Sequence, residues 1–134
     1  MPGRHTILIV EDEPLLRFDL AHELRMHGFD VVEAARAAEA IAVLEARDLP
    51  VALLCTDVQM PGEMDGLDLV RWTLDHRPDV IAAVTSGSAA AIASALTLCR
   101  SGLVFPKPAH AADLARAFQR VLGEASPSSD SSVA

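Results

Sequence analysis

The chain has 134 residues, of which 51% are hydrophobic, and its formal net charge is −8. This length fits one domain with a substantial core, and the acidic balance argues against a nucleic-acid-binding surface, which needs a basic patch. No apolar run approaches the roughly 18 residues of a membrane span, and Thr6–Val10 is too short for a signal peptide. We therefore expect a soluble, cytoplasmic protein that binds neither nucleic acid nor membrane, with Cys55 and Cys99 as buried free thiols.

Short apolar segments alternate with helix-like segments along the chain. The first strand is predicted at Thr6–Val10, which is rich in β-branched residues. A helix is expected over 15–27, with Leu16, Leu20 and Leu24 at fourfold spacing as its inner face. Gly28 is expected to end this helix in the left-handed conformation.

The remaining segments continue the alternation. Further strands are predicted at 30–34, 51–57, 80–84 and 103–105, and further helices at 37–47, 67–76, 89–101 and 110–122. The polar flanks of segment 30–34 are typical of a sheet edge. Residues 124–134 contain five serines and a proline, so we predict one domain over 1–123 and a disordered tail after it.

Five repeats of strand and helix predict an α/β fold, a doubly wound, five-stranded parallel sheet with five helices on its two faces. Right-handed crossovers and the length of the ordered chain favour the flavodoxin-like strand order 2-1-3-4-5. In that order the first, third and fourth strands are neighbours, and the fifth lies beside the fourth. Their carboxyl ends therefore meet at one rim of the sheet.

Reactive side chains follow four of the predicted strands. They are Glu11, Asp12, Asp57, the hydroxyl of Thr85 or Ser86, and Lys107. A single aspartate after a strand is more often a turn or capping residue, but four strand ends that each supply a reactive group favour a functional site.

The combination fits phosphoryl transfer to a carboxylate. Clustered carboxylates suit Mg²⁺, which prefers oxygen ligands. Asp57 is the best candidate nucleophile, because it ends the most buried strand and carboxylates attack phosphorus to give aspartyl-phosphates. Lys107 and the metal would supply positive charge, and the hydroxyl of Thr85 or Ser86 would hydrogen-bond a phosphoryl oxygen.

With these residues in place, the chain resembles the response regulator receiver domains, the phosphoacceptor modules of two-component signalling. The resemblance runs from about Thr6 to Leu122. The motifs that carry it are ILIVEDEP (7–14), TDVQMPG (56–62), MDG (64–66), TSG (85–87) and PKP (106–108). Each motif alone is a weak signal, whereas the ordered set is specific.

The resemblance implies the phosphoacceptor and the metal ligands. Asp57 would become phosphorylated. Asp12 would be the principal ligand of Mg²⁺ (or Mn²⁺), with Glu11 acting through water. Gln59 would offer its backbone carbonyl to the metal.

It also implies a phosphoryl-binding lysine and a switch hydroxyl. Lys107 would pair with the phosphoryl group, and the peptide bond before Pro108 would be cis. Alignment on the Ser86-Gly87 pair gives the switch role to Ser86, whereas the spacing to Lys107 favours Thr85. We take Ser86 as the first candidate and Thr85 as its alternative.

The implied function is a phosphorylation switch in a stand-alone receiver domain. A histidine kinase or histidine phosphotransfer protein would donate the phosphoryl group. The surface of the fourth helix, fifth strand and fifth helix would then shift toward a second state that binds a downstream protein or a second copy of the chain. Such a domain catalyses its own phosphorylation and dephosphorylation and is not a turnover enzyme.

Three features depart from the family pattern. Glu63 lengthens the loop beside Asp57 by one residue, and segment 89–101 carries a single charge, Arg100. Val104 stands where the family often has an aromatic switch residue. Phe105, one place further on, is predicted to face the other side of the strand.

Two rival functions are open at this point. A Mg²⁺-dependent phosphohydrolase would form an aspartyl-phosphate too, but that chemistry normally needs an Asp-x-Asp pair at one strand end and a capping insertion, which the sequence lacks. A receiver-like interaction module that is never phosphorylated is the other rival. The presence of Asp12, Asp57 and Lys107 argues against it.

Overall fold

The structure, a computed structural model, describes residues 4–123, so the predicted tail lies outside the described residues. Within them, strands and helices alternate five times. The elements are β1 (Thr6–Val10), α1 (Pro14–Met26), β2 (Asp30–Ala34), α2 (Ala37–Ala46), β3 (Val51–Asp57), α3 (Gly66–His76), β4 (Ile81–Ser86), α4 (Ala89–Leu98), β5 (Val104–Pro106) and α5 (Ala111–Leu122). None of these helices is long and apolar enough to cross a lipid bilayer.

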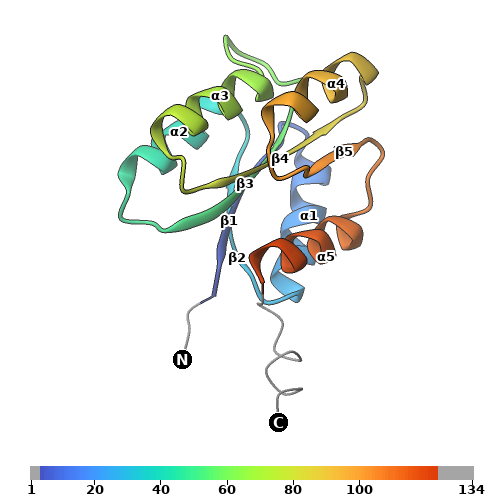
Figure 1. Ribbon diagram of the computed structural model, residues 1–134. Helices are drawn as coiled ribbons and strands as arrows, with labels where there is room; N and C mark the ends of the chain where they lie inside the picture. The colour runs from blue at the N-terminus through green and yellow to red at the C-terminus, as the bar shows by residue number, and fades with distance from the viewer. Residues whose placement is uncertain (1–3, 124–134) are drawn as a thin grey trace.

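The strands form one parallel sheet in the order β2-β1-β3-β4-β5, which confirms the predicted fold and strand order. Helices α1 and α5 cover one face of the sheet, and α2, α3 and α4 cover the other (Figure 1). Asp57 at the end of β3 lies opposite Thr85 of β4, and Ser86 lies opposite Pro106 of β5. The carboxyl ends of the strands are therefore level at one rim.

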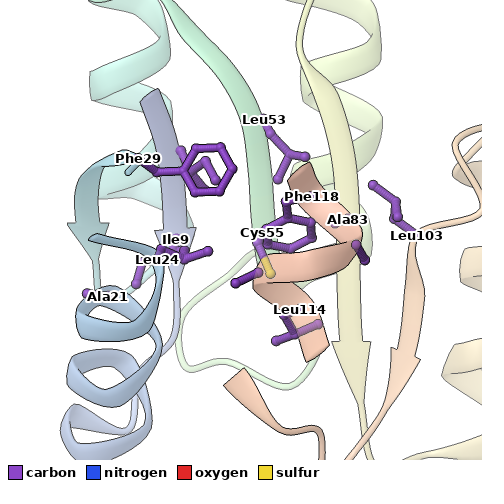
Figure 2. Close-up of a cluster of buried hydrophobic side chains, with 13 residues drawn as sticks. Ile9, Ala21, Leu24, Phe29, Leu53, Cys55, Ala83, Leu103, Leu114 and Phe118 are labelled. Carbon is purple, nitrogen blue, oxygen red and sulfur yellow. The ribbon is translucent and has the colours of Figure 1, made fainter. Parts of the chain in front are cut away.

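The central strands are buried on both faces, as expected for a parallel sheet between two helical layers. Alternate residues of β1 and β3 contribute to two separate clusters. Ile9 and Cys55 face α1 and α5 and belong to the same buried cluster as Phe118 of α5 (Figure 2). Leu8 and Leu54 face α2 and α3 on the other side. The rim residues therefore extend from strands that are packed on both faces.

The predicted inner stripe of α1 is only partly correct. Leu24 is fully buried and Leu20 is partly buried, but Leu16 is 46% exposed, and Ala21 takes the second fully buried position. A strict spacing of four drifts by about 40° per step around a helix of 3.6 residues per turn. Leu16 is thus carried about 80° away from Leu24 and off the sheet-facing side.

Two element ends differ from the prediction by more than one residue. Thr85 and Ser86 belong to β4 rather than following it, because they pair with Phe105 and Pro106 of β5. Helix α4 ends at Leu98 rather than at 101. The Ser101 hydroxyl explains the early end, since it donates to the carbonyl of Ala82 (2.8 Å) and accepts from the N–H of Leu103, forming a turn instead of a last helical turn. Gly28 has the predicted left-handed conformation, with φ at 93°.

Candidate functional site

Glu11 directly follows β1, and hydrogen bonds fix its backbone at both the N–H and the carbonyl. Its N–H donates to the carbonyl of Ala34, and its own carbonyl accepts from the Arg17 guanidinium at 2.8 Å. Arg17 also pairs with Glu33 at 3.4 Å. The carboxylate of Glu11 is mostly buried, with 8% of the residue exposed. The next residue, Asp12, is exposed to solvent.

Lys107 joins the carboxylates of two different strands. Its ammonium lies 3.2 Å from Oδ2 of Asp57 and 3.1 Å from Oε1 of Glu11. Asp57 is 6% exposed at the end of β3. The backbone of Lys107 is fixed as well, since its N–H donates to the carbonyl of Ser86 at 2.8 Å. The Lys107–Pro108 peptide bond is cis, as predicted.

Three carboxylates converge on one point of this rim. Glu11, Asp12 and Asp57 each offer an oxygen, and these oxygens lie within 4.8 Å of one another. Oδ1 of Asp57 is buried, and no hydrogen-bond partner for it exists among the described residues. Three negative charges face the single ammonium of Lys107, and an unpartnered buried carboxylate oxygen is costly. The donor set and its excess negative charge therefore fit a hard divalent cation such as Mg²⁺.

The pKa values of two groups show how tightly this cluster is coupled. Burial raises the pKa of Glu11 above its ordinary value, and the nearby charge of Asp57 adds to the rise, although the Glu13 N–H and the Lys107 ammonium partly offset it. Burial alone would lower the pKa of Lys107, but its hydrogen bonds and charge contacts with Glu11 and Asp57 outweigh burial and raise it. Lys107 is therefore a fixed cation at this site.

The two candidate switch hydroxyls lie on opposite faces of β4. Thr85 lines a cavity on the α1–α5 face. Ser86, which is fully buried, donates its hydroxyl hydrogen to Oε1 of Gln59 at 3.2 Å and accepts from the N–H of Ser88 at 3.0 Å. Ser88 caps the start of α4 by accepting from the N–H of Ala91. Ser86 thus connects the loop after Asp57 to helix α4.

Val104, at the aromatic-switch position, and its neighbour Phe105 also lie on opposite faces of β5. Val104 packs in the cluster beneath α4, and Phe105 packs in the cluster beneath α1 and α5, as predicted from strand alternation. Phe105 makes an edge contact with Phe118 of α5, with 6.2 Å between ring centroids. Because residue 104 is a valine, it has no aromatic ring whose movement could be coupled to that of Ser86.

Gly66, the first residue of α3, is a positioning residue to which the sequence reasoning gave no role. A Cβ there would lie 2.0 Å from the carbonyl oxygen of Asp57 and 2.8 Å from Cα of Val58, far inside any real contact. Its N–H donates to the carbonyl of Val58 at 2.8 Å. A glycine at the first turn of a helix, directly after the capping residue Asp65, is the signal that indicates such a close backbone approach.

Arg17 is a second residue that was missed. Its hydrogen bond to the Glu11 carbonyl and its ion pair with Glu33 of β2 brace the start of the acidic cluster. In the sequence it reads as one of several solvent-exposed charges of α1, because nothing in the local pattern indicates a bond six residues back.

The cavity beside the site has a volume of about 340 Å³ and opens between α1 and α5. Its apolar wall is made by Leu16, Leu20, Pro108, Ala109, Ala111 and Leu114.

Comparisons with known proteins agree with this geometry. The family model described as response regulator receiver domain matches residues 7–119. The response regulator receiver protein CpdR of Brucella abortus is 33% identical over 117 residues, which cover 87% of this chain and 95% of CpdR. The sensor kinase CckA of the same organism is 37% identical over 89 residues, 66% of this chain but 9% of the kinase.

Solved structures of similar proteins have the same fold. The receiver domain of the hybrid histidine kinase CckA superposes with a TM-score of 0.71 at 32% identity, covering 87% of this chain and 98% of that one. A response regulator receiver protein of Sinorhizobium medicae gives a TM-score of 0.78 at 27% identity, covering 89% and 94%. Because the family match spans most of the chain and CpdR is matched nearly end to end, this chain belongs to the response regulator receiver domains of two-component signalling.

Proposed function

We propose that Asp57 accepts a phosphoryl group from a histidine kinase or a histidine phosphotransfer protein. The observation that carries this proposal is the arrangement of Asp57 itself. One of its oxygens contacts the Lys107 ammonium at 3.2 Å. The other is buried beside Glu11 and Asp12 and has no hydrogen-bond partner within residues 4–123. A carboxylate with one oxygen fixed by a cation and one oxygen free is ready to attack an electrophile that enters the cluster.

The proposed transfer needs no proton from the protein. An Asp57 oxygen forms a bond to phosphorus, the bond from phosphorus to the donor's imidazole nitrogen breaks, and the electron pair leaves with that nitrogen. A Mg²⁺ or Mn²⁺ ion held by Glu11, Asp12 and Asp57, with the Gln59 carbonyl, would neutralise charge on the phosphoryl oxygens. Lys107 already lies within reach of Asp57, so its ammonium would stabilise the charge that arrives with the phosphoryl group.

The phosphorylated state is proposed to act through the surface of α4, β5 and α5. Ser86 connects the site to the capping residue of α4 through Ser88, so a hydroxyl drawn toward a phosphoryl group would disturb the start of that helix. Helix α4 carries no charged residue and exposes Leu96 by 56%. A downstream protein or a second copy of the chain is the proposed partner on this surface.

In this proposal the protein is a switch and not a turnover enzyme, although it catalyses its own phosphorylation and dephosphorylation. We also propose that it acts in the cytoplasm. Its cysteines, Cys55 and Cys99, are both free and buried, which fits a reducing compartment.

The test is phosphorylation by acetyl phosphate in the presence of Mg²⁺, followed by intact mass spectrometry. Asp57→Asn should abolish the added phosphoryl group. Asp75→Asn, a matched change of an exposed aspartate on α3, should leave labelling unchanged. Labelling of Asp57→Asn at another residue would contradict the assignment. Steady hydrolysis of a generic phosphate ester would favour the phosphohydrolase instead.

A further inference from the structure

The side chain of Gln59 restrains the proposed switch hydroxyl. Ser86 is fully buried, and its hydroxyl both donates and accepts a hydrogen bond in this structure. It donates to Oε1 of Gln59 at 3.2 Å and accepts from the N–H of Ser88 at 3.0 Å. A serine hydroxyl has one hydrogen, so it cannot donate to Gln59 and to a phosphoryl oxygen at the same time.

We propose that Gln59 is a positioning residue that holds Ser86 in the unphosphorylated arrangement, so that phosphorylation must break the Gln59–Ser86 hydrogen bond before the switch can complete. The proposal rests on the proposed function of Asp57 as phosphoacceptor. It adds a role for the side chain of Gln59 that is separate from any role of its backbone carbonyl toward a metal ion. Its consequence is a threshold for switching, set by one hydrogen bond.

The exchange of partners has a clear direction. The amide oxygen of Gln59 is a neutral acceptor, and a phosphoryl oxygen on Asp57 is a charged one, which forms hydrogen bonds about twice as strong. The Ser86 hydroxyl therefore favours the phosphoryl oxygen over Gln59. The preference equals only the difference in strength between the two hydrogen bonds. A neutral hydrogen bond contributes an equilibrium factor of roughly 2- to 12-fold, so Gln59 lowers the population of the switched state by that factor.

The same exchange reaches helix α4. Ser88 donates its N–H to the Ser86 hydroxyl oxygen and caps α4 through its own hydroxyl. When Ser86 turns away from Gln59, the acceptor of the Ser88 N–H moves as well. The Gln59 side chain is thus part of a hydrogen-bonded path from the loop after Asp57 to the start of α4.

The experiment measures the affinity for beryllofluoride, a phosphoryl mimic, at saturating Mg²⁺ by titration calorimetry. Gln59→Met keeps the length of the side chain and the backbone carbonyl but removes the acceptor. We expect it to bind beryllofluoride roughly 2- to 12-fold more tightly at saturating Mg²⁺. Gln119→Met is the matched control, because that glutamine donates to the carbonyl of His27, the residue after α1, and does not contact Ser86. Its beryllofluoride affinity should be unchanged.

A double-mutant cycle with Ser86→Ala decides the mechanism. If Gln59 acts through Ser86, then Gln59→Met has no effect on beryllofluoride affinity in the Ser86→Ala background. An equal gain in both backgrounds, or no gain in either, would overturn the proposal. A parent chain that binds Mg²⁺ but not beryllofluoride would instead contradict the proposed function, so the two failures are distinguishable.

Discussion

Helices α4 and α5 lie on opposite faces of β5, and they are attached to the sheet very differently (Figure 1). Helix α5 buries Leu114, Ala115, Ala117 and Phe118, and carries charged residues on its outer side. Helix α4 buries Ala95 alone and has no charged residue. Alanine gives α4 a high intrinsic helix propensity, so it stays helical without deep packing. The comparison predicts that α5 is held to the sheet more firmly than α4.

The largest expected difference in stability between the two helices comes from truncating a core side chain of α5. Phe118→Ala should lower the free energy of unfolding by about 3–5 kcal/mol, because the ring is fully buried against the sheet and contacts Phe105. Leu96→Ala on α4 should change it by less than about 0.5 kcal/mol, since that side chain is mostly exposed. Urea unfolding measures both. Equal losses would contradict the contrast between the helices.

A matched pair of alanines sharpens the comparison. Ala95 of α4 and Ala115 of α5 are both fully buried. Enlarging either to leucine overpacks the core, at a cost of about 1–3 kcal/mol. If α4 can shift outward, Ala95→Leu should lie at the low end of that range and Ala115→Leu at the high end. Thermal and urea unfolding of the two variants side by side provide the measurement, and the reverse order would show α4 to be the tighter helix.

The starts of the two helices give a smaller contrast. Ser88 caps α4 with its hydroxyl, whereas His110 at the start of α5 makes no side-chain capping bond. Ser88→Ala should cost about 1 kcal/mol, and His110→Ala should have little effect. Hydrogen exchange at the amide of Ala91, the partner of the Ser88 hydroxyl, should become faster in Ser88→Ala. Unchanged exchange there would mean that packing, not the cap, holds the start of α4.

The contrast also shows what the sequence can and cannot reveal. Strand order, the level rim and the approach of Glu11, Asp57 and Lys107 were predictable, because buried apolar runs and short crossovers leave few topologies. The inner faces of amphipathic helices were less so, since Leu16 belongs to the apolar pattern yet lies partly exposed beside the cavity. Side-chain partners such as Gln59 for Ser86 depend on rotamers and on sub-ångström register, to which no residue pattern gives access.

The reaction rates of the two cysteines can distinguish local opening of α4 from unfolding of the whole sheet. Cys55 lies in β3 beneath α5, and Cys99 directly follows α4. Burial raises the pKa of Cys55 to about 12 and that of Cys99 to about 11, both from 9.0. Near neutral pH the thiolate fractions are therefore about 1,000-fold and about 100-fold below those of free thiols.

Reaction with a thiol reagent should consequently wait for opening of the chain, and Cys99 should react first. Cys55 should react only at the rate set by global unfolding, and mass spectrometry of time points gives both rates. Because the folded chain holds these protons more tightly than the unfolded chain, the stability they contribute is complete below pH 9 and is lost as pH rises through 11 and 12. The free energy of unfolding should therefore fall above pH 9. Simultaneous labelling of both thiols at all pH values would mean that α4 opens only when the sheet does, and the distinction between a mobile α4 and an anchored α5 would fail.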